Sequence, residues 1–299
     1  MRIVTSGLLA ALCLGGLDPA LAADLDFGTL RGSSFDAPAP VGNWDGVYVG
    51  GHGGWSSASF GFGNVFQTPV ANYFRRSTYE SNFGASSLLY PQSARRDGTS
   101  FGAYLGINFQ FDEIVAGAEL DYTHLGVQGT TIDAIGRQNL TNGYWQALDL
   151  IGEAKTKIED YATLRARFGY DVGNVMPYVT AGLAIGRARI TDTVAVEANG
   201  YDQATYNSNK ASGANAPVMH DGYASFNQAD VTQSVPAGPT VITKSREKIV
   251  GGIAAGAGLE FALTSSILLR AEYQYVQFND FDGHKANINT VRGGAALKF

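Results

Sequence analysis

The amino-acid sequence predicts an all-β protein, an eight-stranded antiparallel transmembrane β-barrel arranged as an up-and-down meander with short periplasmic turns and long extracellular loops. Three observations support this fold class. Many segments alternate apolar and polar residues, tight connections alternate with long ones, and the chain ends on an alternating strand whose last residue is Phe299. A strand with one apolar and one charged face fits a barrel wall between lipid and a polar interior.

Residues 1–22 have the composition of a secretory signal peptide. One positive charge at Arg2 precedes an apolar run too short to span a bilayer, and the small-residue motif at 20–22 supplies a cleavage site. The chain's only cysteine, Cys13, lies inside this segment. We therefore expect a mature protein that leaves the cytoplasm and has no disulfide or thiolate chemistry.

Residues 23–43 contain two prolines and no periodicity, which predicts a flexible periplasmic leader before a barrel domain at 44–299. The first strand is expected at about 45–57, where several glycines make its facing ambiguous. The next two strands, 101–110 and 114–123, alternate clearly, and a tight turn joins them.

Five further strands complete the predicted barrel: 163–170, 175–190, 249–261, 267–275 and 291–299. Short turns are expected at 173–174 and 264–265, whereas the connections at 58–98, 126–157 and 191–247 are long. Short turns on the periplasmic side and long loops outside are the usual asymmetry of outer-membrane barrels. The stretches 191–198 and 240–248 could extend their strands into an external hairpin.

Several segments carry a family resemblance, namely 36–51, 162–170, 177–183, 270–275 and the terminal Phe299. In these segments the sequence resembles the porin-family outer-membrane proteins of alphaproteobacteria, of the small eight-stranded type. The resemblance implies a proline-rich leader and insertion by the barrel-assembly machinery, which reads the final strand and its terminal aromatic residue. It does not cover the three long loops.

The polar faces of the strands predict a charged barrel interior. If the apolar faces contact lipid, nine charged side chains point inward: Glu119, Asp121, Arg165, Arg167, Glu260, Arg270, Glu272, Arg292 and Lys298. An eight-stranded barrel is about wide enough for side chains to fill. We therefore expect a salt-bridged polar core, with a selective ion path as the alternative.

The first long loop is locally basic and aromatic. It contains Arg75, Arg76, Arg95 and Arg96, and lipopolysaccharide phosphates are candidate partners for these cations. A solvated loop without a dedicated ligand is the alternative interpretation. An interfacial girdle is expected from Tyr122, Tyr161, Tyr273, Tyr275, Phe278 and Phe299.

Composition and motifs argue against several other functions. Without the signal, 20 basic and 26 acidic residues remain, a net charge of −6 that does not favour nucleic-acid binding. The glycine-rich run 251–258 lacks the Lys-Ser/Thr of a phosphate loop. His52, His124, His220 and His284 lack metal-ligand spacing, so we expect neither a metal nor another cofactor.

The sequence thus favours a non-enzymatic outer-membrane protein with a structural and surface-presenting role. That role would comprise envelope integrity, lipopolysaccharide contact and loop-mediated interaction with a host or the environment. The alternatives are a small diffusion porin and a lipid-modifying enzyme at the barrel rim, for which the outward-facing His124 is the only residue-level support. A secreted soluble barrel with its charges outside is a further alternative.

Overall fold

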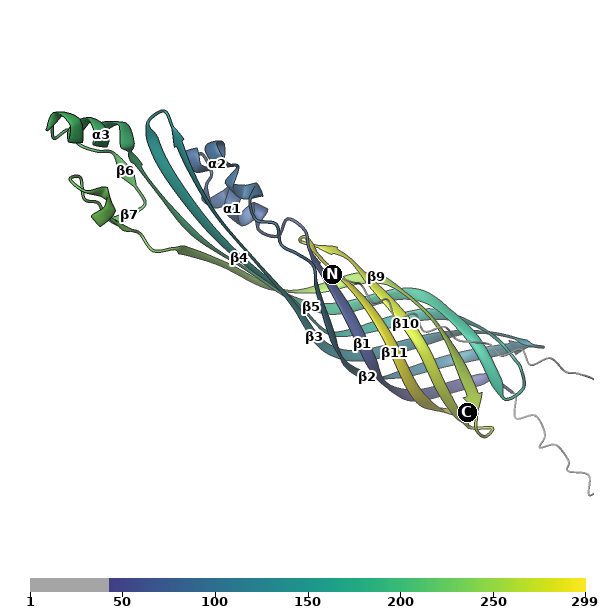
Figure 1. Ribbon diagram of the computed structural model, residues 1–299. Helices are drawn as coiled ribbons and strands as arrows, with labels where there is room; N and C mark the ends of the chain where they lie inside the picture. Colours follow the sequence, from purple (N-terminus) through teal and green to yellow (C-terminus); the bar gives the residue numbers. More distant parts are fainter. Residues whose placement is uncertain (1–42) are drawn as a thin grey trace, which may run out of the picture. The chain divides into compact units, whose positions relative to one another are not determined.

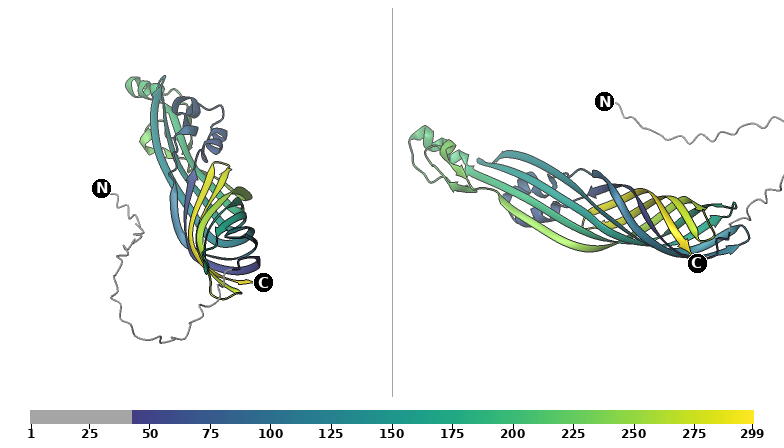
Figure 2. Two further views of the ribbon diagram at one scale, coloured as in Figure 1. Left: turned by 90° about the vertical axis from the view of Figure 1, so that its right-hand side faces the viewer. Right: turned by 90° about the horizontal axis from the view of Figure 1, so that it is seen from below.

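The computed structural model describes residues 43–299, in which eight long strands close into a barrel (Figures 1 and 2). Each strand pairs antiparallel with the next one along the ring, and β1 pairs with β11 to close it. The strands are β1 Gly46–Phe62, β2 Ala94–Phe111, β3 Ile114–Thr141, β4 Tyr144–Tyr170, β5 Val175–Asp202, β9 Thr240–Ala262, β10 Ile267–Phe281 and β11 His284–Lys298. This ring confirms the predicted fold class. The predicted signal peptide, 1–22, and all but the last residue of the predicted leader, 23–43, lie outside the described residues.

Short turns join β2 to β3, β4 to β5 and β9 to β10 at one end of the barrel, as predicted. At the first of them Asp112 adopts a φ of 53°, a left-handed conformation that Asp tolerates better than most residues. The last residue lies at the same end, where the Phe299 amide donates to the Val47 carbonyl at 2.8 Å. This end is the periplasmic one in the predicted orientation.

At the opposite end, β3, β4, β5 and β9 continue far beyond the other four strands (Figure 1). We call this extension the arm and define it as residues 127–158, 188–202 and 240–250. In the arm, β3 and β4 stay paired as far as Thr141↔Tyr144, and β5 and β9 stay paired as far as Val196↔Thr240. The predicted extension of strands at 191–198 and 240–248 is therefore confirmed.

The prediction of a long loop at 126–157 was wrong, because this segment forms a β-hairpin. Its turn is Asn142-Gly143, with φ angles of 51° and 79°. Two consecutive residues with positive φ make a type I′ turn, whose twist matches that of the flanking strands and which favours Asn-Gly.

The first long loop folds into short helices: α1 Gln67–Tyr73, α2 Thr78–Phe83 and η1 Ala85–Ser87. The α2 helix starts where the Ser77 side chain accepts a hydrogen bond from the Glu80 amide, and it ends at Gly84 with a φ of 63°. The tip of the arm carries α3 Gln203–Ser212, η2 Val231–Gln233 and the short strands β6 His220–Asp221, β7 Tyr223–Ser225 and β8 Val235–Pro236. No helix of residues 43–299 is long and apolar enough to cross a membrane.

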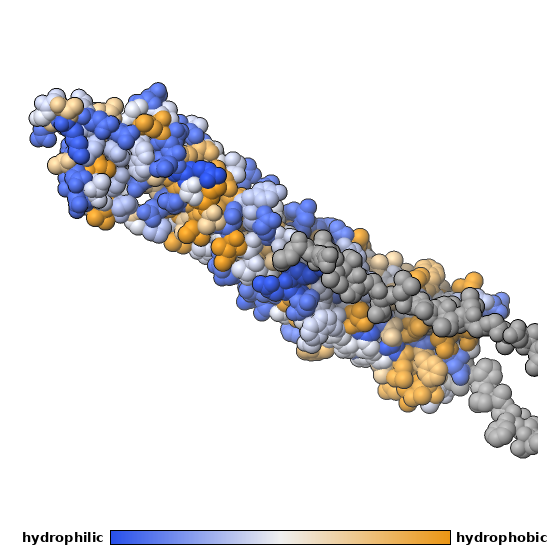
Figure 3. All heavy atoms as spheres, in the orientation of Figure 1, coloured by the Kyte–Doolittle hydropathy of each residue, from blue (hydrophilic) through white to orange (hydrophobic). Residues whose placement is uncertain are grey.

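An apolar belt surrounds the barrel. On β2 the outward positions run from Phe111 to Phe101, both more than 60% exposed. That span is about 33 Å along the strand, or about 25 Å along the axis of a barrel with ordinary strand tilt, which matches the lipid-facing band of outer-membrane barrels. Apolar residues gather near the periplasmic end of the visible face, while hydrophilic residues are frequent over the arm (Figure 3). The alternative of a soluble barrel with charges outside was therefore wrong.

Two predicted girdle residues are not on the lipid-facing surface. Tyr161 and Phe278 are 1% and 2% exposed and lie inside the barrel, with ring centroids 6.2 Å apart in a T-shaped contact. Both share the parity of inward positions, Tyr161 with Arg165 and Phe278 with Glu272. Tyr122, Tyr273 and Phe299 are exposed, and Tyr275 is half-buried.

Candidate functional site

The barrel interior is filled in three layers, and the first closes the periplasmic end. It is an apolar and aromatic cluster around Trp44, Tyr48, Tyr104 and Met176, all at most 2% exposed. The Tyr48 and Tyr104 rings meet edge to face with centroids 6.1 Å apart. The Trp44 indole donates to Asp171 Oδ1 at 2.9 Å, which fixes the indole beside the turn between β4 and β5.

The second layer is a network of buried ion pairs. Glu272 Oε1 accepts from Arg165 Nη1 at 2.5 Å and from Arg292 Nη2 at 3.0 Å. Glu119 likewise pairs with Arg165 at 2.5 Å and with Arg270 at 2.7 Å. The network joins eight of the nine charged residues that strand parity directs inward, namely Glu119, Asp121, Arg165, Arg167, Glu260, Arg270, Glu272 and Arg292.

Four arginines and four carboxylates balance in this network, which we call the ionic layer. Tyrosines complete it, because Tyr48 and Tyr178 donate to Glu119 and Glu272 at 2.9 and 2.8 Å. The guanidinium carbon of Arg167 also lies 4.0 Å from the Tyr178 ring centroid, within cation–π range. Buried charges are tolerated only when they are paired and hydrogen-bonded, so the mutual pairing explains how the sequence keeps these residues inside.

Lys298 does not join the ionic layer. Its Nζ donates to the Asn43 carbonyl at the periplasmic end, since the last residue of β11 lies beyond the level of the network. His52 joins instead, with Nε2 lying 3.1 Å from Asp121 Oδ2 and 3.1 Å from Arg292 Nη1. The sequence analysis missed His52 because glycines obscured the facing of the first strand. Its register partners are Gly102 and Gly294, and this pair of glycines leaves room for the imidazole.

The third layer is apolar and lies on the arm side. It includes Phe60, Phe62, Val276, Phe278 and Ile288, each at most 3% exposed. The same cluster continues to the first-loop helices through Phe66, Val70 and Phe74, which pack with arm residues such as Leu150 and Ile190. The third layer was not predicted. A signal for it is present in the sequence, because Ala58, Phe60 and Phe62 are alternate residues of β1 and so lie on its inward face.

His284 is buried within the third layer. Its Nδ1 lies 2.7 Å from Thr156 Oγ1, its Nε2 lies 3.2 Å from Asp192 Oδ1, and the Phe62 and Phe281 rings flank it. Thr156 is fully buried, so this arrangement offers no accessible nucleophile. The described residues contain no group of three metal-ligating side chains. His124 is exposed and lies against Phe101 on the lipid-facing side.

Where the apolar belt ends, a band of charged residues begins. On β5, Ile185 is followed at outward positions by Arg187 and Arg189, whose side chains are 54% and 50% exposed. Arg187 pairs with Asp160 at 2.6 Å and Glu159 at 3.3 Å, and Arg189 with Glu247. We call this set the rim band: Lys157, Glu159, Asp160, Arg187, Arg189 and Glu247.

The four predicted loop cations are all exposed. Arg75 and Arg76 follow α1, while Arg95 and Arg96 are consecutive residues of β2 and so point to opposite faces of that strand. None of the four forms an ion pair with another described residue. They are free to contact an external anion, but Arg95 and Arg96 do not point at a common site.

Hydrogen bonds fix the first loop to the tip of the arm. The hydroxyls of Tyr79 and Tyr144 donate to the two carboxylate oxygens of Asp221 at 2.8 and 2.5 Å. Burial and the hydrogen bond to Asp221 raise the pKa of Tyr79, so the phenol stays protonated. The loop and the arm therefore present one shared surface.

Comparison with known proteins identifies the family. A family model described as the outer membrane protein beta-barrel domain matches residues 27–299. The chain belongs to this family. It is an outer-membrane protein. Its strands form the outer-membrane barrel that the sequence predicted.

Named relatives agree with this assignment. The chain is 26% identical to the 31 kDa outer-membrane immunogenic protein of Brucella melitensis, over 88% of the chain and 87% of the relative. It is 24% identical to the 22 kDa outer membrane protein of Rhizobium leguminosarum over the full length of both. The resemblance to alphaproteobacterial outer-membrane proteins is thus confirmed, and these names describe outer-membrane proteins and not enzymes. Among solved structures, Ail of Yersinia pestis matches 85% of the chain and 99% of its own length, at 13% identity and a TM-score of 0.35.

Proposed function

We propose that this protein is a structural and surface-presenting component of the outer membrane, and that it is neither a diffusion porin nor an enzyme. The filled interior is the observation that carries the proposal. A diffusion path would have to cross the Trp44 cluster, the ionic layer and the Phe60–Phe278 layer in turn. Small barrels whose interior side chains meet leave no continuous aqueous channel.

The proposed contact with lipopolysaccharide rests on the rim band and the loop cations. The arginines of the rim band stand directly outside the apolar belt, at the level where headgroup phosphates meet an outer-membrane barrel. Guanidinium groups bind phosphate through paired charge-assisted hydrogen bonds. Carboxylates such as Glu159 and Glu247 could share divalent cations with the same phosphates. Arg75, Arg76, Arg95 and Arg96 are proposed as a second set of contacts farther out.

Two further parts of the proposal concern assembly and presentation. Phe299 is 79% exposed at the periplasmic end, which supports its proposed recognition by the barrel-assembly machinery. The arm and the first loop extend the surface away from the membrane, which supports interaction with a host or environmental ligand.

Planar-bilayer recording of the full-length refolded protein tests the closed interior. We expect no current above that of the bare bilayer, with a large general porin in the same apparatus as the control for detection. Reproducible ohmic steps would instead favour the diffusion porin.

A separate preparation, purified from outer membranes without refolding, tests the lipid contact. Purified from outer membranes, a variant with both Arg187→Gln and Arg189→Gln should retain less lipopolysaccharide phosphate than wild type. The matched control carries Arg137→Gln and Lys210→Gln, two exposed cations outside the rim band, one in the arm and one on α3 at its tip. Equal lipopolysaccharide in all three preparations would contradict the proposed rim contact.

A further inference from the structure

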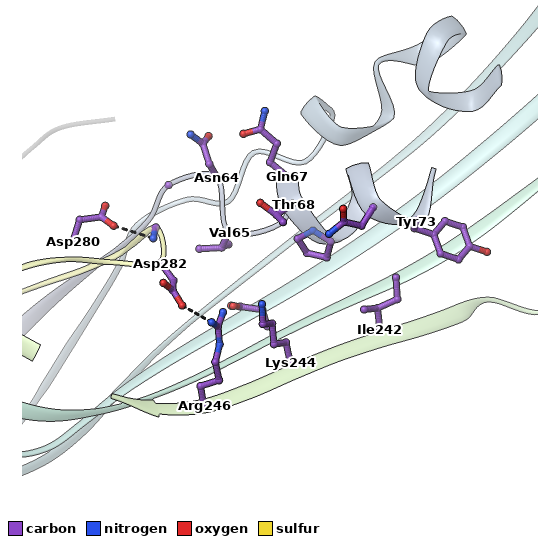
Figure 4. Close-up of a pocket in the computed structure, with 15 residues that line it drawn as sticks. Asn64, Val65, Gln67, Thr68, Tyr73, Ile242, Lys244, Arg246, Asp280 and Asp282 are labelled. Atoms are coloured by element: carbon purple, nitrogen blue, oxygen red, sulfur yellow. Dashed lines mark hydrogen bonds and ion pairs between the residues drawn. The ribbon is translucent and has the colours of Figure 1, made fainter. Parts of the chain in front are cut away.

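A cavity of about 850 Å³ opens on the arm side of the membrane belt (Figure 4). We call it the cleft. The first-loop segment 63–73 forms one wall, β9 forms the other, and the turn between β10 and β11 closes one end. The strands β10, β11 and β1 end near the level of the cleft, whereas β9 continues toward the tip of the arm. The cleft lies beside β9, in the space beyond the ends of those three strands.

Most of the residues that line the cleft are polar, while apolar atoms supply the larger part of its accessible surface. Ten of its fifteen residues have polar or charged side chains, and only Val65, Pro69 and Ile242 are aliphatic. Sites for drug-like or lipid ligands combine an apolar surface with only a few polar groups, whereas this cleft has ten polar or charged residues around it. The first-loop wall includes Asn64, Gln67 and Asn72, whose amides each offer both donors and an acceptor, and Figure 4 shows the Asn64 and Gln67 side chains extending away from β9. Such a wall matches a ligand whose surface carries many hydroxyl groups.

An aromatic ring stands in the same wall. Tyr73 is 42% exposed, and its hydroxyl donates to Thr240 Oγ1 at 3.2 Å across to β9. The buried Phe74 ring supports it from behind at a centroid distance of 4.9 Å. The ring is thus held in place while one part of it stays accessible, an arrangement suited to the apolar C–H face of a sugar ring.

The charged residues of the cleft differ in their partners, and its lining holds three carboxylates, Asp192, Asp280 and Asp282, beside the two cations Lys244 and Arg246. Arg246 and Lys248 both pair with Asp282 at 2.7 Å, and the hydrogen bond from Lys248 with the charge of Arg246 lowers the pKa of that carboxyl. Asp280 is held by the Gly283 amide at 2.9 Å. Lys244, which is exposed, forms no ion pair with another described residue and lies between Ile242 and Arg246 on the cleft side (Figure 4). It is the cation with which an anionic group could pair.

We propose that the cleft binds a short acidic oligosaccharide, with Asn72 and Tyr73 on its sugar rings and Lys244 on a phosphate or carboxylate group. This deepens the proposed surface-presenting role and rests on it, since the cleft must face outward. Two sources share this chemistry: the core oligosaccharide of the cell's own lipopolysaccharide, and acidic glycans outside the cell.

The test measures binding to the full-length protein in detergent micelles. One probe is the phosphorylated core oligosaccharide released from lipopolysaccharide by mild acid, with its dephosphorylated form for comparison. The other probe is a glycan array that holds matched neutral and acidic oligosaccharides. We expect the acidic forms to bind more tightly and Lys244→Gln to weaken that binding by about tenfold, the loss of one charge-assisted contact.

Lys210→Gln, which removes an exposed cation on α3 outside the cleft, is the matched control and should bind as wild type does. A second variant, Asn72→Ala, should weaken acidic and neutral sugars equally. Heat-modifiable migration on gels establishes that each variant contains a closed barrel. The array and the core probe distinguish the two sources.

Absence of saccharide binding by a folded protein would overturn the proposal, and so would equal binding by wild type and Lys244→Gln. An acidic peptide that competes as well as the saccharide would also overturn it. These outcomes leave the closed interior untouched, because that part of the proposed function is measured by conductance.

Discussion

At the scale of single residues, the ionic layer holds four arginines that each depend on a shared carboxylate. Glu272 serves both Arg165 and Arg292, and Tyr178 donates to its second oxygen. Removing one member of a buried ion pair costs far more than the pair contributes, because the remaining charge stays buried without compensation. The stability of the barrel should therefore be sensitive to Glu272 in particular.

We predict that Glu272→Gln lowers the free energy of unfolding by about 3–5 kcal/mol. The measurement is urea unfolding in lipid vesicles, followed by heat-modifiable migration. Glu247→Gln is the matched control, since Glu247 pairs with the half-exposed Arg189 on the arm, and its unfolding midpoint should scarcely change. Equal midpoint shifts in both variants would show that the ionic layer is not specially sensitive.

Strand parity could predict which side chains point inward, because every second residue of a strand faces the same way. It could not predict height along the barrel, which places Lys298 below the ionic layer and Phe60 above it. The inward position of His52 could not be predicted from β1 alone, because the glycines of that strand obscure its facing. It follows from the residues of β2 and β11 that pair with His52.

At the scale of elements, the arm shows why long strands were mistaken for a loop. A membrane barrel needs only about ten residues a strand, so polar residues after the apolar belt resemble a connection. In the arm, Glu153, Lys155 and Lys157 alternate with Ala154 and Thr156, which is the pattern of a strand with one face in water. The Asn142-Gly143 turn was the local signal that could have identified this hairpin.

We predict that Gly143→Ala loosens the β3–β4 hairpin and leaves the barrel intact. Gly143 has a φ of 79°, and an added Cβ would lie 2.7 Å from the Ala204 side chain, so strain and crowding both oppose the substitution. Limited proteolysis of intact cells should cleave the variant faster within residues 127–158. Gly238→Ala is the control, because Gly238 has open space around it and no positive φ. Indistinguishable cleavage of the two variants would show that the turn does not limit hairpin stability.

At the scale of the whole described region, one ring of strands changes into an open sheet. Pairing of β2 with β3 ends at Phe101↔His124, and pairing of β9 with β10 ends at Gly252↔Phe278. Beyond these pairs β2, β1, β11 and β10 stay paired with one another for a short distance, to Phe60↔Ala94 between β1 and β2. Only β3, β4, β5 and β9 continue into the arm, and the first-loop helices cover the apolar side of these four strands. The apolar third layer bridges both parts, whereas the ionic layer and the Trp44 cluster belong to the ring alone.

This division predicts the behaviour of a chain without the arm. Asn-Gly turns would replace residues 129–156 and 190–246, closing the registered pairs Gln128↔Lys157 and Arg189↔Glu247, and a short Gly-Ser linker would replace 63–93. We expect this chain to fold in vesicles, to migrate as a heat-modifiable barrel and to remain non-conducting, because two of the three interior layers are complete without the arm. Single-channel recording beside the full-length protein is the measurement. If the shortened barrel conducts while the full-length protein does not, the first-loop helices and the arm close the path, and the ionic layer is permeable to ions.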